Sequence, residues 1–435
     1  MPPVALKPAP GLAPDAAADV ADTVRTMLAR IRAGGEEVVR DYARRLDGWE
    51  NEIVVPPEAA AEAGARLHPD LRDAIAYAHA NIRAFAEAQR ASIREFETEL
   101  RPGLVAGQRL IPLAAAGAYV PGGRYAHIAS ALMTITTAKA AGVTHVTAAS
   151  PPRGDGIPDA VLHAMHLAGA DRILALGGVQ AVAAMAEGLF GARPADILVG
   201  PGNAFVAEAK RQLFGPVGID MVAGPTDSMV IADATADPHT VAWDLISQAE
   251  HGATSPVWLV TDHRPLAEAV MRLLPDCVAT LPELNRAAAA AAWDAMGEVI
   301  LCDTREDMAA TADAHAPEHL HVQAVDLLWW RARLSAYGSL FLGADTTVAF
   351  GDKAAGPNHV LPTGRAARHT GGLSAHKFLK VVTWQRATSE ALPELVRATT
   401  AVSRGEGMEA HARAAEIRLD TGARAIDLAR EGQVT

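Results

Sequence analysis

Residues 145–214 read HVTAASPPRGDGIPDAVLHAMHLAGADRILALGGVQAVAAMAEGLFGARPADILVGPGNAFVAEAKRQLF. Three short apolar runs in this stretch, HVTAAS, RILAL and DILVG, predict β-strands. The longer segments between and after them, such as PDAVLHAMHLAGA and AFVAEAKRQLF, predict helices. Strands that alternate with helices of about ten residues are typical of a parallel sheet with crossover helices.

The same alternation resumes after residue 228, in DSMVIAD, PVWLVTD, LAEAVMRLL, EVILCDT and GSLFLG. The sequence therefore predicts an α/β protein with two Rossmann-like parallel-sheet units. The expected parts are an N-terminal arm over 1–20, a first α/β domain made of 21–117 with 228–373, a second α/β domain over 118–227, and a helical tail over 374–435.

Composition excludes several classes of protein. Half of the 435 residues are hydrophobic, and the net charge of −12 is a poor match for nucleic-acid binding. No apolar run is long enough for a signal peptide or a membrane span. Two cysteines, Cys277 and Cys302, are too few for a disulfide framework or a four-cysteine zinc site. We expect a cytoplasmic protein without nucleic-acid or membrane partners.

Glycine-rich loops follow several of the expected strands: YVPGGRYAH, ALGGVQA, VGPGNAF and AGPTDS. Parallel sheets of this class bind ligands at the carboxyl ends of their strands. None of the loops matches the G-x-G-x-x-G dinucleotide fingerprint, and GPGNAF has Phe205 where its third glycine would stand. Spacing alone supports nucleotide binding and tight packing equally.

The segment DLISQAEHG, residues 244–252, carries two polar side chains at the end of an apolar helix. Gln248 and His251 are three residues apart, a spacing that puts both on one helix face. They could share a metal ion or a substrate group, or they could form an ordinary solvated helix end.

Two further segments combine polar residues with helix breakers. In APEHL, Pro317 is expected to hold Ala316 in extended geometry, and Glu318 and His319 follow at once. A carboxylate beside an imidazole suits proton transfer near neutral pH, although a surface loop would read the same. The long loop FGDKAAGPNHVLPTG, residues 350–364, is expected to be functional because its apolar flanks argue against disorder.

Eight motifs together resemble the histidinol dehydrogenase family. They are YVPGG, GGVQA, VGPGN, VAEAKRQLFG, GIDMVAGPT, SQAEHG, APEHL and GDKAAGPNHVLPT, in the family's order over about 115–365, and GEGMEAH extends the match toward the C-terminus. The resemblance implies a zinc-dependent, NAD-linked oxidation of a small alcohol to a carboxylic acid through an aldehyde. It also implies an intertwined homodimer with shared sites, in which His411 acts in the partner's site.

The resemblance assigns roles to individual residues. With one Zn²⁺ per chain, the implied ligands are Gln248, His251, Asp352 and His411. The implied acid/base pair is Glu318 and His319. The implied NAD contacts are Tyr119, Gln180 and Asn203, and the implied substrate contacts are Thr226, His359 and Glu406.

Some motifs depart from the histidinol-oxidising members. The chain has GPTD where they usually have GPSE, and GLSAHKF, with His376 and Lys377, where they usually have an acidic pair. Arg124 and His127 add basic character to GGRYAHIAS. YGSLFLG, VAFGDKAAG and TWQRAT resemble the sulfopropanediol 3-dehydrogenases, which oxidise 2,3-dihydroxypropane-1-sulfonate to sulfolactate.

We therefore expect an anionic sulfonate substrate, with His127 and Lys377 as contacts to it; the alternative is that these basic residues lie on the surface. Glu406 is shared with the histidinol enzymes and keeps L-histidinol as the alternative substrate. An inactive metal-binding scaffold is the third hypothesis.

Overall fold

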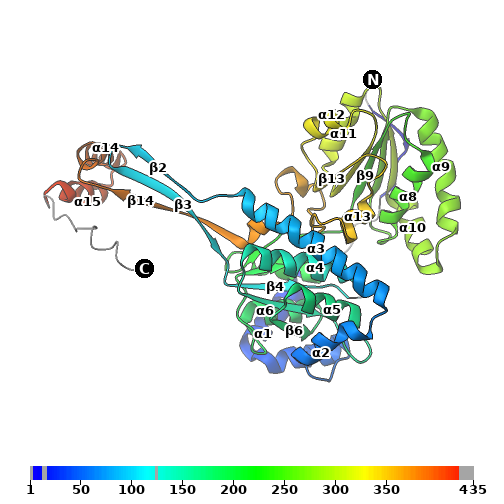
Figure 1. The fold of residues 1–435 in the computed structure, drawn as a ribbon, viewed down its shortest axis with the longest axis horizontal. Coiled ribbons are helices and arrows are strands. Elements are labelled where there is room, and N and C mark those ends of the chain that lie inside the picture. The colour runs from blue at the N-terminus through cyan, green and yellow to red at the C-terminus, as the bar shows by residue number, and fades with distance from the viewer. Residues whose placement is uncertain (1–2, 12–16, 123–125, 421–435) are drawn as a thin grey trace. The chain divides into compact units, whose positions relative to one another are not determined.

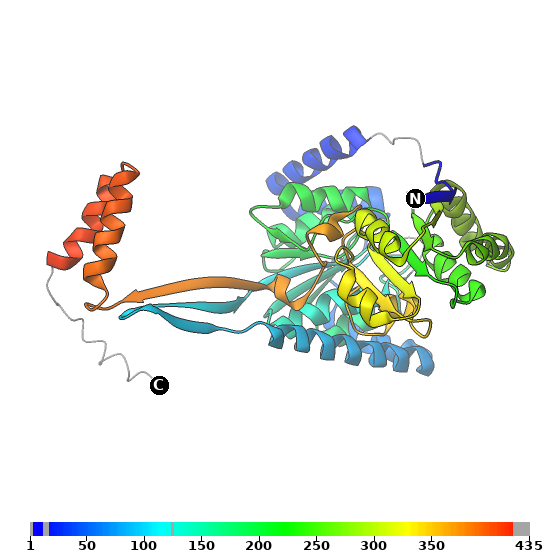
Figure 2. The same ribbon diagram turned by 90° about the horizontal axis from the view of Figure 1, so that it is seen from above.

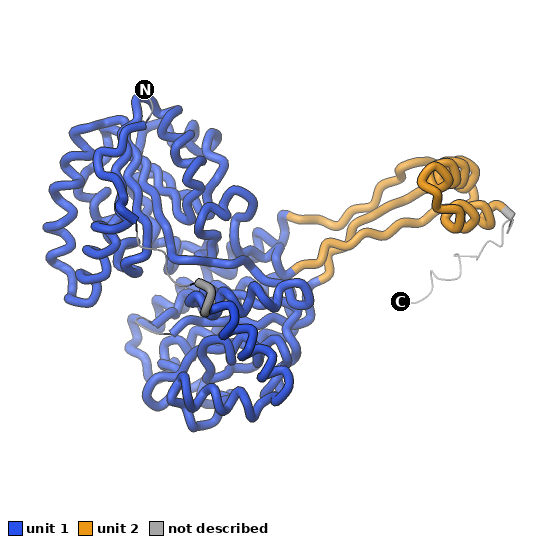
Figure 3. The backbone as a smooth tube through the Cα atoms, turned by 180° about the vertical axis from the view of Figure 1, so that it is seen from behind, with its two compact units in different colours: residues 1–92, 112–378 blue, residues 93–111, 379–435 orange. Residues whose placement is uncertain are grey.

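The computed structural model describes residues 3–11, 17–122 and 126–420. It divides into two compact units, coloured separately in Figure 3. Unit 1 comprises residues 1–92 and 112–378, and unit 2 comprises residues 93–111 and 379–435. No helix among the described residues combines the length and the apolar composition that crossing a bilayer requires.

One sheet of unit 1, here called sheet B, has the strand order β6-β5-β4-β7-β8, with all neighbours parallel. Its strands are β4 (Ala115–Tyr119), β5 (His145–Ser150), β6 (Arg172–Ala175), β7 (Ile197–Val199) and β8 (Gly218–Ile219). Its helices are α4 (Ile128–Ala141), α5 (Asp159–Ala168), α6 (Gly178–Glu187) and α7 (Ala204–Leu213).

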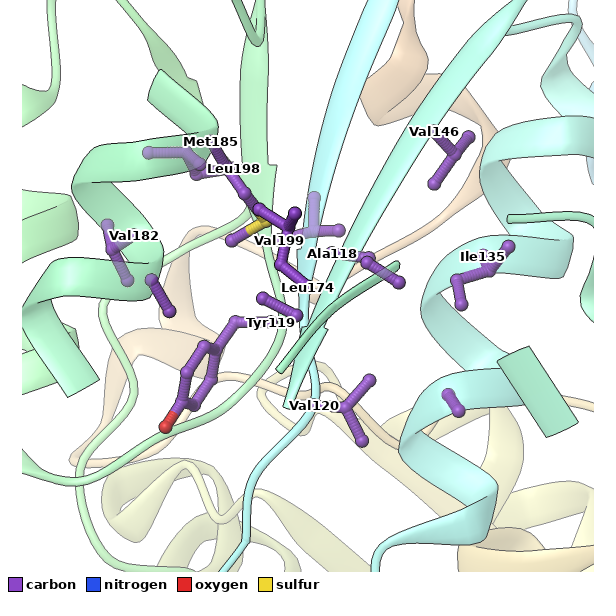
Figure 4. Close-up of a cluster of buried hydrophobic side chains, with 14 of the residues drawn as sticks. Ala118, Tyr119, Val120, Ile135, Val146, Leu174, Val182, Met185, Leu198 and Val199 are labelled. Carbon is purple, nitrogen blue, oxygen red and sulfur yellow. The ribbon is translucent and has the colours of Figure 1, made fainter. Parts of the chain in front are cut away.

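The strands of sheet B are mostly apolar because helices cover both faces. Figure 4 shows the resulting core, in which Leu174 and Leu198 from β6 and β7 lie with Ala118 of β4. These three side chains are at most 1% exposed. The ring of Tyr119 points away from the side chain of Ile135, toward the end of the sheet.

The other sheet of unit 1, here called sheet A, has the order β1-β11-β10-β9-β12-β13. Its strands are β1 (Val4–Lys7), β9 (Ser228–Ala232), β10 (Val257–Thr261), β11 (Gly297–Leu301), β12 (His319–Gln323) and β13 (Ser339–Leu342). Only β1 runs antiparallel to its neighbour. Its helices are α8 (Pro238–Ala249), α9 (Arg264–Ala279), α10 (Glu283–Met296), α11 (Arg305–His315), α12 (Leu327–Arg333) and α13 (Val348–Lys353). Two parallel-sheet units confirm the predicted α/β class.

The expected domain of 21–117 with 228–373 required the N-terminal helices to pack on sheet A, but they do not. Helix α1 (Ala17–Tyr42) packs against α6 and α7, and α3 (Pro69–Ser92) packs against α4. The short α2 (Pro57–Glu62) packs against α5. Figure 1 shows these blue helices beside the elements of sheet B. The expected boundary was wrong because an apolar stripe shows that a helix is buried without showing which sheet it covers.

Both ends of the chain contain strands that the sequence did not predict. The expected arm over 1–20 contributes β1 to sheet A, and Figure 2 shows the N-terminal strand beside elements of that sheet. The expected helical tail begins with β14 (Leu379–Ala387), which pairs with the hairpin of β2 (Phe96–Arg101) and β3 (Leu104–Pro112) in unit 2. Helices α14 (Leu392–Gly405) and α15 (Glu409–Asp420) follow.

Candidate functional site

A cleft of about 460 Å³ opens where the two sheets of unit 1 face each other. Sheet B contributes loops that follow the carboxyl ends of its strands β4 and β7. Sheet A contributes the segments that precede the amino ends of β9, β10 and β12. The cleft gathers eight of the expected site residues: His127, Asn203, Thr226, His251, Glu318, His319, Asp352 and His359.

Glu318 lies immediately before β12 and is buried. Its Oε2 accepts hydrogen bonds from the Thr226 hydroxyl at 2.5 Å and from the Asp227 backbone N–H at 3.2 Å. Burial raises the pKa of Glu318 to about 7, although the charge of His319 and the Thr226 hydrogen bond oppose the rise. A carboxyl group with this pKa can hold or release a proton near neutral pH.

The imidazole of His319 lies between two carboxylates. Its Nδ1 is 3.7 Å from Glu318 Oε2, and its Nε2 is 3.4 Å from Asp352 Oδ1. Burial opposes protonation of His319, but the charges of Glu318 and Asp352 outweigh it and raise the pKa to about 9. Burial alone would raise the pKa of Asp352, because it disfavours the charged carboxylate. The adjacent imidazole of His319 outweighs this effect and lowers the pKa of Asp352 below its usual range. The three groups form a buried proton-holding cluster.

The backbone before Glu318 differs from the expectation. Ala316 has φ 49° and ψ 61°, in the left-handed region, whereas the proline that follows it favours extended geometry. Ala316 caps helix α11, and its N–H donates to Ala312 O. This C-cap role overrides the preference of a residue before proline, and the resulting turn leads directly into Glu318.

Asp227 supports the acid/base pair, a role that no sequence motif predicted. Its Oδ1 accepts from the Glu318 backbone N–H at 2.6 Å, and its Oδ2 accepts from the Gly364 N–H at 3.1 Å. Asp227 is buried at the start of β9, the neighbour of β12. Its position in GPTDS, directly before an apolar strand, is the signal that could have marked it as buried.

His359 holds the loop over residues 350–364 against sheet B. Its Nδ1 lies 2.9 Å from the Asp352 carbonyl oxygen, which can only accept. Its Nε2 is then the nitrogen that accepts from the Ser130 hydroxyl of α4, at 3.1 Å. His359 therefore fixes the backbone of Asp352, whatever else it contacts in the cleft.

The expected metal ligands of unit 1 lie close together. Gln248 is buried on the last turn of α8, and its Nε2 donates to Asp352 Oδ2 at 3.3 Å. Its Oε1 is buried without a hydrogen-bond partner. Helix α8 ends at Ala249, so His251 lies in the turn beyond it and lines the cleft.

This donor set fits a divalent cation. A buried amide oxygen without a partner, beside a carboxylate and an imidazole, offers the oxygen and nitrogen donors that such an ion prefers. In the described ranges, no group of three or more His, Cys, Asp or Glu side chains is arranged so that it could hold a metal ion by itself. Unit 1 supplies only His251 and Asp352 of these types to the expected set, because His411 belongs to α15 of unit 2.

A second cavity, of about 510 Å³, lies at the carboxyl edge of sheet B. All three residues expected to contact NAD line it: Tyr119, Gln180 and Asn203. The Tyr119 hydroxyl accepts from the Gly178 N–H at 3.2 Å, and Asn203 Oδ1 caps α7. Gln180 Nε2 donates to Asp47 Oδ2 at 2.9 Å, a partner that the sequence analysis missed.

Some glycines of the glycine-rich loops are required by tight packing, and others line the candidate ligand site. A Cβ on Gly200 would lie 2.0 Å from the Tyr119 carbonyl oxygen, and its φ of 109° is left-handed. Tight packing therefore accounts for Gly200. Gly202, by contrast, lines both the cleft and the second cavity, as do Pro121 and Asn203. The two cavities adjoin, so ligands bound in them can meet.

Not all of the expected substrate contacts lie in the cleft. Lys377 lines a separate cavity of about 650 Å³ with Arg331 and His369, so this chain does not bring it together with His127. The neighbouring His376 contacts the end of α3, with Nε2 2.7 Å from Gln89 O. Glu406, the residue after α14, belongs to unit 2 with His411, and Arg124 lies outside the described residues.

Lys353 is a basic residue of the cleft to which the sequence analysis gave no role. It directly follows Asp352 at the end of α13, and its side chain is exposed. Its position in the loop FGDKAAGPNHVLPTG could have suggested it, because that loop also carries Asp352 and His359.

Comparisons with known proteins identify the family of this chain. The histidinol dehydrogenase family model matches residues 13–419. A histidinol dehydrogenase homolog of Ruegeria pomeroyi is 72% identical, over 95% of this chain and 96% of the relative. A sulfopropanediol 3-dehydrogenase of the same organism is 60% identical, over 93% of each chain.

A solved structure is also similar throughout. The crystal structure of histidinol dehydrogenase from Elizabethkingia anophelis superposes with a TM-score of 0.88 at 32% identity, covering 94% of this chain and 93% of that one. The family resemblance inferred from the sequence motifs is confirmed, and the chain belongs to the histidinol dehydrogenase family.

Proposed function

We propose that this protein oxidises a small primary alcohol to a carboxylate through an aldehyde, with NAD as the oxidant in both steps. One alcohol, one water and two NAD⁺ give one carboxylate, two NADH and three protons. The observation that best supports this activity is the buried Glu318–His319–Asp352 cluster, which lies in a cleft that adjoins the cavity lined by Tyr119 and Gln180.

The acid/base pair would accept the protons that the oxidation releases. In its neutral form, His319 would take the proton of the substrate hydroxyl at Nε2, on the side of Asp352. The carboxylate of Glu318 is held by Thr226 and by the Asp227 N–H. It would take a proton from the water that adds to the aldehyde. Both groups are buried, which keeps bulk water from competing for these protons.

Gln248, His251 and Asp352 would hold a zinc ion, with His411 of a second copy completing the set in a homodimer with shared sites. When bound, zinc supplies a Lewis acid that stabilises negative charge developing on a substrate oxygen. The unpartnered Gln248 Oε1 is the observation that supports this assignment. The chain's own contribution is to hold three donors from α8, the turn after it, and α13.

The second cavity would hold NAD, which accepts hydride when bound. Gln180 supports this assignment, because its Oε1 is buried without a hydrogen-bond partner while its amide nitrogen is tied to Asp47. Such an oxygen can accept a hydrogen bond from a ligand. The Pro121 and Gly202–Asn203 edges shared with the cleft would bring the two ligands into contact.

For the substrate we propose a small alcohol with a fixed anion, specifically 2,3-dihydroxypropane-1-sulfonate oxidised to 3-sulfolactate. Lys353 and His127 both line the cleft. Burial, followed by the charges of His359 and Lys353, lowers the pKa of His127 to about 4. His127 would therefore act as a neutral N–H donor, and Lys353 would supply the positive charge that a bound anion requires.

L-histidinol is the alternative substrate, and the retained Glu406 is the observation that favours it. Histidinol carries an ammonium group and an imidazole, which suit carboxylate partners better than they suit Lys353. The third hypothesis, an inactive metal-binding scaffold, predicts zinc binding without turnover of either alcohol.

Steady-state assay of the purified protein on both alcohols tests the proposal. We expect oxidation of the sulfonate with two NADH formed per alcohol. We expect Lys353→Met to raise KM for the sulfonate by roughly 10–100-fold, as loss of a charged contact worth about 1.5–3 kcal/mol would. Lys377→Met, which removes the same charge from the separate cavity, is the matched control and should leave KM unchanged. Oxidation of histidinol without oxidation of the sulfonate would overturn the substrate assignment.

A further inference from the structure

A buried carboxylate lies beneath the cleft and has no part in the chemistry proposed above. Asp244, on α8, is 7% exposed and does not line the cleft. Its Oδ1 accepts from the Thr347 hydroxyl at 2.7 Å, and its Oδ2 accepts from Gln323 Nε2 at 2.6 Å. His321 Nδ1 lies 3.4 Å from the same Oδ2, and His321 is fully buried.

The partners of Asp244 belong to the elements that present the candidate site. Helix α8 carries Gln248, four residues after Asp244. Strand β12 carries His321 and Gln323 and begins with His319. Thr347 is the N-cap of α13, which carries Asp352. A single carboxylate therefore joins α8, β12 and α13.

The two sets of contacts form parallel layers. In the upper layer, Asp352 meets Gln248 and His319. Four residues along a helix correspond to about 6 Å, and two residues along a strand correspond to about 7 Å. Along α8 the contacts of Asp244 therefore lie about one helical turn from those of Gln248, while on β12 they begin at His321 and extend to Gln323; both sets link the same three elements.

A carboxylate is a costly choice for this place if packing is its only purpose. Desolvating a charge is expensive, and an apolar side chain of similar volume often stabilises a core equally well. Unlike an apolar side chain, the carboxylate fixes the positions of its neighbours, because its two oxygens hold the donors of Gln323 and Thr347 at hydrogen-bond distance. His321 is held at its other side, with Nε2 2.9 Å from the Gly343 carbonyl oxygen.

We propose that Asp244 is a positioning residue that sets the spacing of Gln248, His319 and Asp352 through the elements that carry them. The inference rests on the proposed function, because that function gives the spacing its purpose. Replacing the carboxylate by an amide leaves one of the donors of Gln323 and Thr347 without an acceptor, and small shifts of α13 against α8 then spread the three site residues apart. The consequences are weaker zinc binding and slower turnover.

The test compares Asp244→Asn with wild type in two measurements. Zinc affinity is measured on the metal-free protein by competition with a chromophoric chelator, and kcat and KM are measured on the zinc-loaded enzyme. We expect zinc affinity and kcat each to fall by roughly 10–100-fold, as is common for residues that orient metal ligands. The dissociation constant for NADH should not change, because the cavity at sheet B does not include α8 or α13.

Asp313→Asn is the matched control for a purely structural role. Asp313, on α11, accepts hydrogen bonds from the backbone N–H of Ser335, from the Ser335 hydroxyl and from the Ala336 N–H. None of these partners lies on α8, β12 or α13. This variant should lower the melting temperature without changing zinc affinity or kcat at temperatures where the protein is folded.

Two milder variants cover the case in which Asp244→Asn does not fold. Thr347→Val removes one contact of Asp244, whereas Thr347→Ser keeps the hydroxyl; we expect the first to weaken zinc binding and the second to restore it. Wild-type zinc affinity and kcat in folded Asp244→Asn or in Thr347→Val would overturn the positioning role alone. A wild-type protein that neither binds zinc nor oxidises an alcohol would overturn the proposed function, and with it the purpose assigned to Asp244.

Discussion

Replacing Lys210 by methionine should destabilise the sheet B half of unit 1 without affecting sheet A. Lys210 of α7 and Asp220 after β8 form an ion pair in which both side chains are at most 3% exposed. The Lys210 ammonium also donates to Gly200 O at 2.9 Å. Methionine keeps most of the side-chain volume, so the change removes a charge and leaves the packing largely intact.

The magnitude follows from what Asp220 retains. Removing one partner of a buried ion pair costs about 3–5 kcal/mol, because an uncompensated charge is left behind. Asp220 keeps hydrogen bonds from the Gly200 N–H at 2.7 Å and from the Met221 N–H at 2.6 Å. We therefore expect the lower end, about 3 kcal/mol. The double variant Lys210→Met/Asp220→Asn should recover part of this loss, since no buried charge then remains.

Amide hydrogen exchange, resolved by peptide, measures the effect where it occurs. A loss of about 3 kcal/mol should speed exchange in peptides covering β4 and β7 by roughly 150-fold, with little change in peptides covering β9 and β10. KM for NAD should rise as well, because Gly200 leads into Asn203 at the proposed NAD cavity. Less than tenfold faster exchange in β4 and β7, or a double variant less stable than Lys210→Met, would refute the reasoning.

Four further outcomes are expected. The kcat/KM should rise with pH through about 7 as Glu318 loses its proton, and again toward about 9 as His319 does. Glu318→Gln should remove the rise near 7 and slow oxidation by roughly 10²–10⁴-fold, and an unchanged rise near 7 in the variant would contradict the assignment. His251→Ala should lose most of its zinc by elemental analysis, and full zinc content would exclude it as a ligand. Mixing inactive His251→Ala and His411→Ala chains should restore partial activity in heterodimers, because one shared site would be intact; verified heterodimers without activity would place His411 in its own chain's site. Asp237 caps α8, and hydrogen bonds from the Thr240 backbone N–H and hydroxyl lower its pKa. A lowered folded-state pKa stabilises the protein above the unfolded-state pKa, and this contribution is lost as the pH falls through the folded-state pKa. Asp237→Ala should therefore cost about 1 kcal/mol at neutral pH and progressively less as the pH falls below the usual range of a carboxyl group, as measured by thermal unfolding along a pH series.

Local patterns were sufficient for several strands of the two parallel sheets and for much of the site. The alternation over 145–214 predicted sheet B because its strands and helices are neighbours in sequence. Glu318 and His319 could be found because they are adjacent and follow a proline. The motif resemblance pointed to most of the remaining cleft residues, which local periodicity alone would have left as helix ends and loops.

The features that were missed depend on segments far apart in the chain. Nothing in DLISQAEHG distinguishes Asp244 from a solvated helix residue, because its burial depends on β12 and α13. The basic character of His127 and Lys377 predicted a preference for an anionic substrate. It could not show whether the two side chains share one cavity, and they line different cavities. The N-terminal helices showed an apolar stripe whose partners, α6 and α7, begin well over a hundred residues later.

The antiparallel strand β1 also constrains the order in which the protein can fold as it is synthesised. Lys7 of β1 donates to Gly297 O, 290 residues further along the chain. At a synthesis rate of roughly 5–20 residues per second, β1 waits on the order of 15–60 s for its partner strand to be made. During that time Val4, Ala5 and Leu6 form an unpaired β-prone segment on the ribosome-bound chain. Sheet A is thus completed late in translation, and a nascent-chain binding factor that shields this segment would raise the yield of native protein.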